Sequence, residues 1–284
     1  MRKETEGVDY ALLIAVMLLV FTGVMMVFSS SFYYAMATWE NNYLFLQKHM
    51  VWAGGGVAAM IVASMINYKS YRRFGFLMFA SSFVFLGLLF TPLGVEINGA
   101  VRWLDVGPLT FMPSEFAKIA AIIFMAGFLE SRQRKLSRFS SGMLPVLLIV
   151  GAYFVLIYKQ PNLSNAITLS GIIMAMSFVA GVNVYQLFTL GAAGGAGIYL
   201  AILSSEWRAK RFLTFLDPFQ DTFGDGWQVI QSLYALGSGG LFGVGLGQST
   251  LNKLYIPEPQ NDFIFATIGE ELGFAGASLL ILLY

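Results

Sequence analysis

Residues 10–30 read YALLIAVMLLVFTGVMMVFSS, a run without a single charged side chain. A helix needs about 20 apolar residues to cross the hydrocarbon core of a bilayer, so this run predicts a transmembrane helix. The whole chain of 284 residues has the same character, with 57% apolar residues, 12% charged residues and a mean hydropathy of +0.69. Soluble domains carry about 25% charged residues. The sequence therefore predicts a polytopic α-helical integral membrane protein.

Seven further apolar stretches follow the first, and together they predict an all-α fold, a transmembrane helical bundle. The predicted spans are residues 10–30, 50–66, 74–91, 116–129, 143–158, 166–181, 187–203 and 263–284. We expect one membrane domain over residues 1–284, with a long structured extracellular loop at 204–262 before the eighth span. Ala35-Met36-Ala37 is typical of a signal-peptide cleavage site, but the first apolar run is too long for a signal peptide. The eighth stretch reaches Tyr284 without a charged flank, which predicts a natural protein that continues beyond it.

The distribution of Lys and Arg predicts the orientation, because cytoplasmic loops carry an excess of both. One side of the predicted topology holds Arg2, Lys3, Lys69, Arg72, Arg73, Arg132, Arg134, Lys135 and Arg138. The short loops of the opposite side hold only Lys48, Arg102, Lys118 and Lys159. Segments 31–49, 92–115, 159–165 and 204–262 are therefore expected outside, the last by span parity.

Composition also excludes several chemistries. The chain has no cysteine, so thiolate nucleophiles, disulfides and cysteine-based metal sites are excluded. The single histidine, His49, lies at the mouth of an apolar segment, which favours an interfacial residue over a catalytic triad. A net charge of +1 argues against attraction to nucleic acid.

Segment 96–118, EINGAVRWLDVGPLTFMPSEFAK, concentrates polar groups before a predicted span. Pro113 is suited to the first turn of a helix, which places Glu115 and Lys118 on one face at a spacing of three residues. Charges at the start of a membrane helix indicate function, although a structural ion pair is the alternative. Arg102 and Trp103 add a fixed cation and an aromatic ring suited to the interface.

Two other polar segments interrupt the apolar pattern. Residues 159–165, KQPNLSN, contain the helix breaker Pro161 and are either a functional loop or simply a tight turn. In 204–262, Arg208, Lys210 and Arg211 fit either anionic headgroups or a membrane-edge anchor. Around 227–234 the spacing predicts a short amphipathic or re-entrant helix. The glycines of 237–247 and 191–197 lack a P-loop or Rossmann context, so we expect tight turns and close helix approach.

The loop ends in PEPQND at 257–262, directly before the eighth span. A carboxylate half-shielded by apolar residues suits a general base, but Asp262 is equally suited to cap the following helix. Glu270 and Glu271 lie deeper, and we expect them to pair with polar groups of other helices.

Together these motifs resemble the SEDS family, which includes FtsW, RodA and SpoVE. The matching stretches are NGAVRWLDVGPLTFMPSEFAK, KQPNLSNA, RFLTFLDPFQDTFGDGWQVIQSLYALGSGGLFGVGLGQS and YIPEPQNDFIFATIGEELGF. Their forms are more similar to the FtsW and SpoVE branch than to RodA. The resemblance implies about ten spans and a peptidoglycan glycosyltransferase that polymerises lipid II at the outer face of the bacterial cytoplasmic membrane. It also implies a class B penicillin-binding protein as partner and leaves a divalent cation open.

Residue by residue, the resemblance makes Asp262 the essential aspartate of the family. The substrate-binding set that we expect is Arg102, Trp103, Glu115, Lys118, Gln160 and Pro257. Two positions depart from the family pattern: Asn261 replaces a threonine, and Asn162 replaces the aspartate of a Gln-Pro-Asp motif, which puts an acidic role at 162 in doubt.

The mechanism implied is an inverting glycosyl transfer without a covalent intermediate. Asp262 would deprotonate the acceptor 4-hydroxyl, and Arg102 and Lys118 would stabilise the leaving pyrophosphate, with Glu115 orienting Lys118. A lipid II flippase and a scaffold that recruits a transpeptidase are the alternatives. A flippase needs ionisable groups through the bilayer midplane, whereas the polar groups here gather at the predicted outer mouth.

Overall fold

The computed structural model describes residues 8–97, 99–106, 109–136, 138–224, 226–250 and 260–284. Their contacts divide the chain into two compact units, residues 1–64 with 201–284, and residues 65–200. Each unit is described by itself. The single membrane domain expected from the sequence stays a prediction.

The first unit is built from helices. It contains α1 (Tyr10–Trp39), α2 (Leu44–Met65), α8 (Glu206–Leu216), a 3-10 turn (Pro218–Asp221), α9 (Trp227–Ser238) and α10 (Ile264–Leu283). Asp9 begins α1, because its side chain accepts hydrogen bonds from the backbone N–H groups of Ala11 and Leu12. Within this unit α10 packs against α1 and α9. The helix predicted around 227–234 is confirmed as α9.

A glycine-rich loop after α9 pairs with a break inside α10. At Gly273 the backbone leaves the helical region, with φ 68° and ψ −172°. Backbone carbonyls before this break therefore lose the hydrogen bonds that a continuous helix would give them. The loop supplies the partners: the N–H groups of Val244 and Gly245 donate to the carbonyls of Glu270 and Glu271, both at 3.0 Å. A Cβ on Gly243 would lie 2.1 Å from the Glu271 carbonyl oxygen, so only glycine fits there. The close approach predicted for the glycines of 237–247 is confirmed at Gly239 and Gly243, whereas a Cβ at Gly237, Gly240 or Gly247 would meet nothing within 4 Å in the described structure.

The glycines of 191–197 behave differently. A Cβ added to Gly191, Gly194, Gly195 or Gly197 would have no neighbouring atom of the described structure within 4 Å. The close helix approach expected at this cluster is therefore not found.

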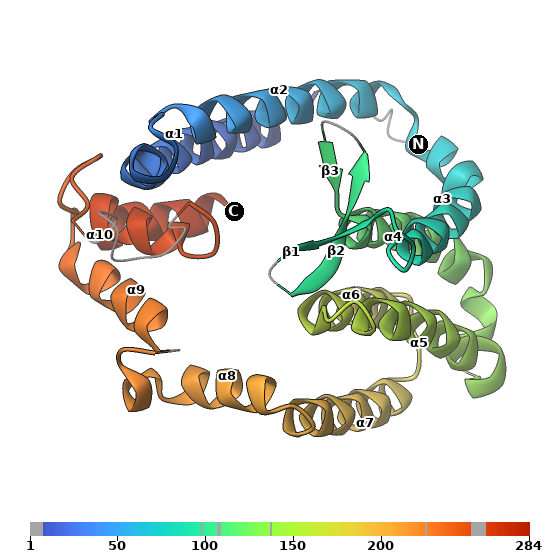
Figure 1. The fold of residues 1–284 in the computed structure, drawn as a ribbon. Helices are drawn as coiled ribbons and strands as arrows, with labels where there is room; N and C mark the ends of the chain where they lie inside the picture. Colours follow the sequence, from blue (N-terminus) through green and yellow to red (C-terminus); the bar gives the residue numbers. More distant parts are fainter. Residues whose placement is uncertain (1–7, 98, 107–108, 137, 225, 251–259) are drawn as a thin grey trace. The chain divides into compact units, whose positions relative to one another are not determined.

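The second unit combines helices with a small sheet (Figure 1). Its elements are α3 (Tyr68–Leu88), β1 (Gly94–Ile97), β2 (Ala100–Val106), β3 (Leu109–Phe111), α4 (Pro113–Ser131), α5 (Leu144–Tyr158), α6 (Leu163–Val179) and α7 (Val184–Leu203). The strands form an antiparallel sheet in the order β1-β2-β3, and β2 lies beside α4. The all-helical expectation missed this sheet, because its three short strands lie inside a polar connection between two apolar stretches.

Helices α3 to α6 enclose the core of the second unit. Leu86, Met125, Ile157 and Ile173 have no exposed surface, and they come from four different helices. The hydroxyl of Tyr153, also buried, lies 2.8 Å from Ser82 Oγ. This core fixes the ends of α4 and α6, where the polar residues gather.

Each of the eight predicted spans coincides with a helix, although lengths differ. By length and composition, four described helical segments could cross a membrane: Tyr10–Trp39, Phe139–Tyr158, Val184–Leu203 and Ile264–Leu283. Helices α2 and α3, which are separated by a short break, together make a fifth candidate. The polytopic helical fold is confirmed, and the number of eight spans stays a prediction.

Candidate functional site

The first turns of α4 and α6 lie together in the second unit. The side-chain amide of Asn165 donates to Ser114 Oγ at 3.1 Å and to Glu115 Oε1 at 3.5 Å. We call the group formed by Arg102, Ser114, Glu115, Lys118, Asn162 and Asn165 the polar corner. Because the N-terminus of a helix carries a partial positive charge, two such ends at one place favour an anion.

The ion pair predicted at the start of α4 is confirmed. Met112 has an extended backbone and Pro113 follows in the first turn, so the helix begins there. Lys118 Nζ lies 2.8 Å from Glu115 Oε2. The Lys118 side chain is 22% exposed and that of Glu115 is 55% exposed. Since Glu115 also accepts from Asn165, it is suited to orient Lys118.

Arg102 reaches the polar corner from β2. Its Nη2 donates to the carbonyl of Pro161, and its Nε is buried with no acceptor among the described residues. Trp103 follows on the opposite face of the strand, where it pairs with Val95 of β1 and is half-buried. The sheet that the sequence did not predict is therefore the element that positions Arg102.

Asn162 caps α6, because its side chain accepts from the backbone N–H of Asn165 at 3.3 Å. Its amide nitrogen is buried and has no hydrogen-bond acceptor in the described structure, and the residue is 5% exposed. Two donors, Arg102 Nε and Asn162 Nδ2, thus lack acceptors in the polar corner. Buried donors of this kind normally find a partner, so the polar corner is suited to bind an oxygen-rich anion.

Gln160 is placed differently from the other predicted binding residues. Its side chain is 3% exposed and donates to the carbonyl of Leu86 on α3 at 3.2 Å. With Lys159 and Pro161 it lines a cavity of about 450 Å³ that also contains Thr91 and Glu96. Gln160 therefore ties the α5–α6 turn to α3 at the wall of this cavity.

Asp262 belongs to the first unit, in a turn directly before α10. It is exposed, so the apolar shielding expected from the sequence is not found there. The cap position of α10 is Phe263, with no side-chain capping bond, so the capping role considered for Asp262 is wrong. An exposed carboxylate is accessible to a substrate. Pro257, the remaining predicted site residue, lies outside the described residues.

The pairing with another helix that the sequence predicted is confirmed for Glu271, whereas Glu270 pairs with residues of the loop after α9. Both are 1% exposed. Glu271 accepts from Ser29 Oγ on α1 at 2.6 and 2.8 Å. Glu270 accepts from Ser249 Oγ and from the N–H and hydroxyl of Thr250, the last two at 2.9 and 3.0 Å. Sequence reasoning missed Ser249 and Thr250, although hydroxyl residues beside a glycine run could have indicated this role.

The basic residues of α8 make local contacts. Arg208 donates to the carbonyl of Ala201 at 2.7 Å, Lys210 lies 3.5 Å from Asp221, and Arg211 lies over the ring of Trp207.

Among the residues that the structure describes, no three His, Asp or Glu side chains gather as a metal site.

Comparison with known proteins identifies the family. The sequence profile of the family described as "Cell cycle protein" (FtsW, RodA and SpoVE) matches residues 10–284. The chain belongs to the FtsW/RodA/SpoVE family. The resemblance proposed from the motifs is thereby confirmed.

Members of the FtsW/RodA/SpoVE family are similar along almost the whole chain. Stage V sporulation protein E of Bacillus subtilis (strain 168) is 40% identical over 100% of this chain and 78% of its own length. A probable peptidoglycan glycosyltransferase FtsW of Geobacter sp. (strain M18) is 36% identical over 99% of this chain and 78% of its own length.

Solved structures agree with the fold of the FtsW/RodA/SpoVE family. A chain of a peptidoglycan synthase complex, solved to explain the coordination of polymerization and crosslinking, is 26% identical with a TM-score of 0.75. The match covers 97% of this chain and 74% of that chain. The rod shape determining protein RodA of Thermus thermophilus has a TM-score of 0.66 at 23% identity, covering 97% and 71%, and supports the fold alone.

Proposed function

We propose that the protein is a peptidoglycan glycosyltransferase that polymerises lipid II into glycan strands at the outer face of the cytoplasmic membrane. The observation that carries this proposal is the 36% identity, over 99% of the chain, to a protein named probable peptidoglycan glycosyltransferase FtsW. Its role would lie in division or sporulation, since the relatives include a sporulation protein as well as FtsW.

The polar corner is our candidate for the donor's pyrophosphate. When the glycosidic bond forms, the bond from the anomeric carbon to the pyrophosphate oxygen breaks and negative charge develops on that oxygen. Arg102 and Lys118 supply fixed cations, and the N-termini of α4 and α6 add partial positive charge. The buried donors without acceptors, Arg102 Nε and Asn162 Nδ2, support this assignment. Glu115 holds Lys118 in position through the 2.8 Å ion pair.

Asp262 is our candidate for the general base. It would take the proton from the acceptor 4-hydroxyl, whose oxygen then attacks the anomeric carbon of the donor with inversion. A general base must come within hydrogen-bond reach of the proton that it accepts. The exposed position of Asp262 supports that requirement, and its turn is fixed at one side by the buried residue Gln260.

A class B penicillin-binding protein is the partner that we propose. The similar complex couples polymerization with crosslinking, and a glycan polymerase needs a transpeptidase to link its strands. Stable complexes bury about 1,200–2,000 Å² in total. Co-purification of the natural protein with its transpeptidase tests this pairing.

The experiment that tests the function is polymerisation of purified lipid II by the natural protein in detergent. Glycan strands longer than the disaccharide are the expected product. The same protein in vesicles with labelled lipid II tests the rival transport function. Movement of lipid II between leaflets without any polymer would contradict the proposal, and so would a protein that does neither.

A further inference from the structure

Helices α4 and α6 form a pair that starts at the polar corner. On α4 the exposed residues Glu115, Ile119, Ile122 and Ala126 follow one another at spacings of four, three and four, so they form one stripe. On α6 the residues Ser164, Thr168, Gly171 and Ala175 repeat the same spacing and are exposed too. Every member of the α6 stripe is small, whereas α4 contributes isoleucines.

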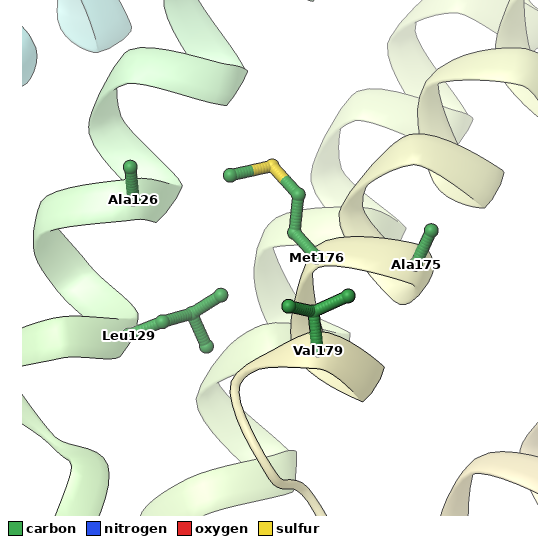
Figure 2. A pocket seen from close by; sticks show the side chains of 5 residues that line it. All are labelled: Ala126, Leu129, Ala175, Met176 and Val179. Carbon is green, nitrogen blue, oxygen red and sulfur yellow. The ribbon is translucent and has the colours of Figure 1, made fainter.

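One member of each stripe, Ala126 and Ala175, lines a pocket far from the polar corner. Ala126 and Leu129 of α4 and Ala175, Met176 and Val179 of α6 line it, and its volume is about 370 Å³. Figure 2 shows Leu129 and Met176 extending from opposite helices into the space between them. All five lining residues are apolar. At 1.5 Å per residue, Ala126 lies ~16 Å along α4 from Glu115.

We propose that the surface between the two stripes, which runs from the polar corner to this pocket and which we call the α4–α6 groove, binds the isoprenoid tail of the lipid-linked sugar substrate, with the pyrophosphate in the polar corner. The inference rests on the proposed function. The α4–α6 pair carries the cations and helix N-termini of the polar corner at one end and a pocket lined only by apolar side chains at the other. That combination fits an amphiphile with an anionic head and a long hydrocarbon tail. A depth of ~16 Å is about half of the ~30 Å hydrocarbon core, so a long tail can follow the groove within the membrane.

A packed helix is the main alternative occupant, because small residues also favour helix association in membranes. The polar corner argues against it. Asn162 is 5% exposed, yet its amide nitrogen has no acceptor among the described residues, as is true of Arg102 Nε. Anionic oxygens are acceptors for donors of this kind, whereas an apolar helix surface would leave them unpaired. An ordinary phospholipid has similar chemistry, and the experiments below separate it from the substrate.

The first experiment changes the pocket and the length of the tail together. Ala175→Phe fills the pocket, and Leu148→Phe on α5, where Leu148 is 66% exposed, is the matched control. With the natural tail, we expect Ala175→Phe to raise KM about tenfold, the effect of displacing about two methylene groups. With a truncated tail, too short to span ~16 Å, its KM should stay within about twofold of the wild type. Equal effects on both tails would overturn the inference.

The second experiment measures occupancy without activity. Because the chain has no cysteine, Ala175→Cys and Leu148→Cys each create a unique thiol. Lipid II in mixed micelles should slow maleimide labelling at 175 severalfold and leave 148 unchanged. Equal protection by phosphatidylglycerol would contradict a substrate site, and protection only in the transpeptidase complex would indicate a protein helix instead.

The two proposals fail in different ways. A wild type that does not polymerise lipid II refutes the proposed function, whatever happens at the groove. A wild type that polymerises normally, with Ala175→Phe insensitive to tail length, refutes only the groove.

Discussion

Replacing Gly243 by alanine should disrupt the hydrogen-bonded contact between the glycine-rich loop and the break in α10. Gly243 has φ +79°, a conformation that costs an alanine about 1–2 kcal/mol. Its new Cβ would lie 2.1 Å from the Glu271 carbonyl oxygen and 2.7 Å from the Gly273 nitrogen. The backbone must therefore separate and open the hydrogen bonds from Val244 and Gly245, both 3.0 Å long.

The size of the effect follows from these contacts. The two carbonyls that lose their partners belong to Glu270 and Glu271, both 1% exposed, and each buried group left unpaired costs about 1–3 kcal/mol. With the strain at residue 243, the sum is roughly 3–8 kcal/mol. Native proteins are stable by only about 5–15 kcal/mol. Gly243→Ala should therefore lower the thermal transition of the detergent-purified protein strongly, or abolish folding.

Gly237→Ala is the matched control, because Gly237 lies within α9 and a Cβ there meets nothing within 4 Å. Alanine is a better helix former by about 0.5–1 kcal/mol, so the control should be unchanged or slightly stabilised. Thermal unfolding followed by tryptophan fluorescence measures both variants. A Gly243→Ala protein with the wild-type transition would show that the loop and the break do not pair as described.

Three other substitutions test separate parts of the structure. Ser29→Ala removes the hydroxyl that donates to Glu271 and should cost about 1–3 kcal/mol of stability, which thermal unfolding measures; an unchanged transition would contradict the bond. Lys118→Met should lower kcat of lipid II polymerisation about 100-fold, whereas Lys69→Met at the start of α3 should not; equal rates for the two would exclude the cation role. Gln160→Leu should lower stability by about 1–3 kcal/mol with little change in KM. A large rise in KM at normal stability would instead support the direct substrate binding that the sequence predicts for Gln160.

The helices were predictable because their apolar runs are long, but their ends were not. The helix that begins at Tyr10 continues nine residues beyond Ser30, to Trp39, through a serine-rich stretch. Ser30 and Ser31 fit there because their hydroxyls donate to carbonyls of their own helix, Val27 and Phe28. Local polarity thus misled the boundary, although the existence of the helix was clear.

The candidate site could be predicted only in part. The pair of Glu115 and Lys118 followed from helical spacing, and the structure confirms it. The position of Arg102 did not follow, because it depends on a strand pairing and on a bond to Pro161, which lies 59 residues away in the sequence. The exposure of Asp262 depends on the conformation of one turn, which local composition does not determine.

Polymerisation of lipid II by an Asp262→Asn variant tests the central claim most directly. The wild-type protein should produce glycan strands. Asp262→Asn keeps the size of the side chain but removes the base, so its polymerisation rate should fall at least about 100-fold. Glu40→Gln, a similar change at an exposed carboxylate after the first helix, should retain full activity. Full activity of Asp262→Asn would contradict the account.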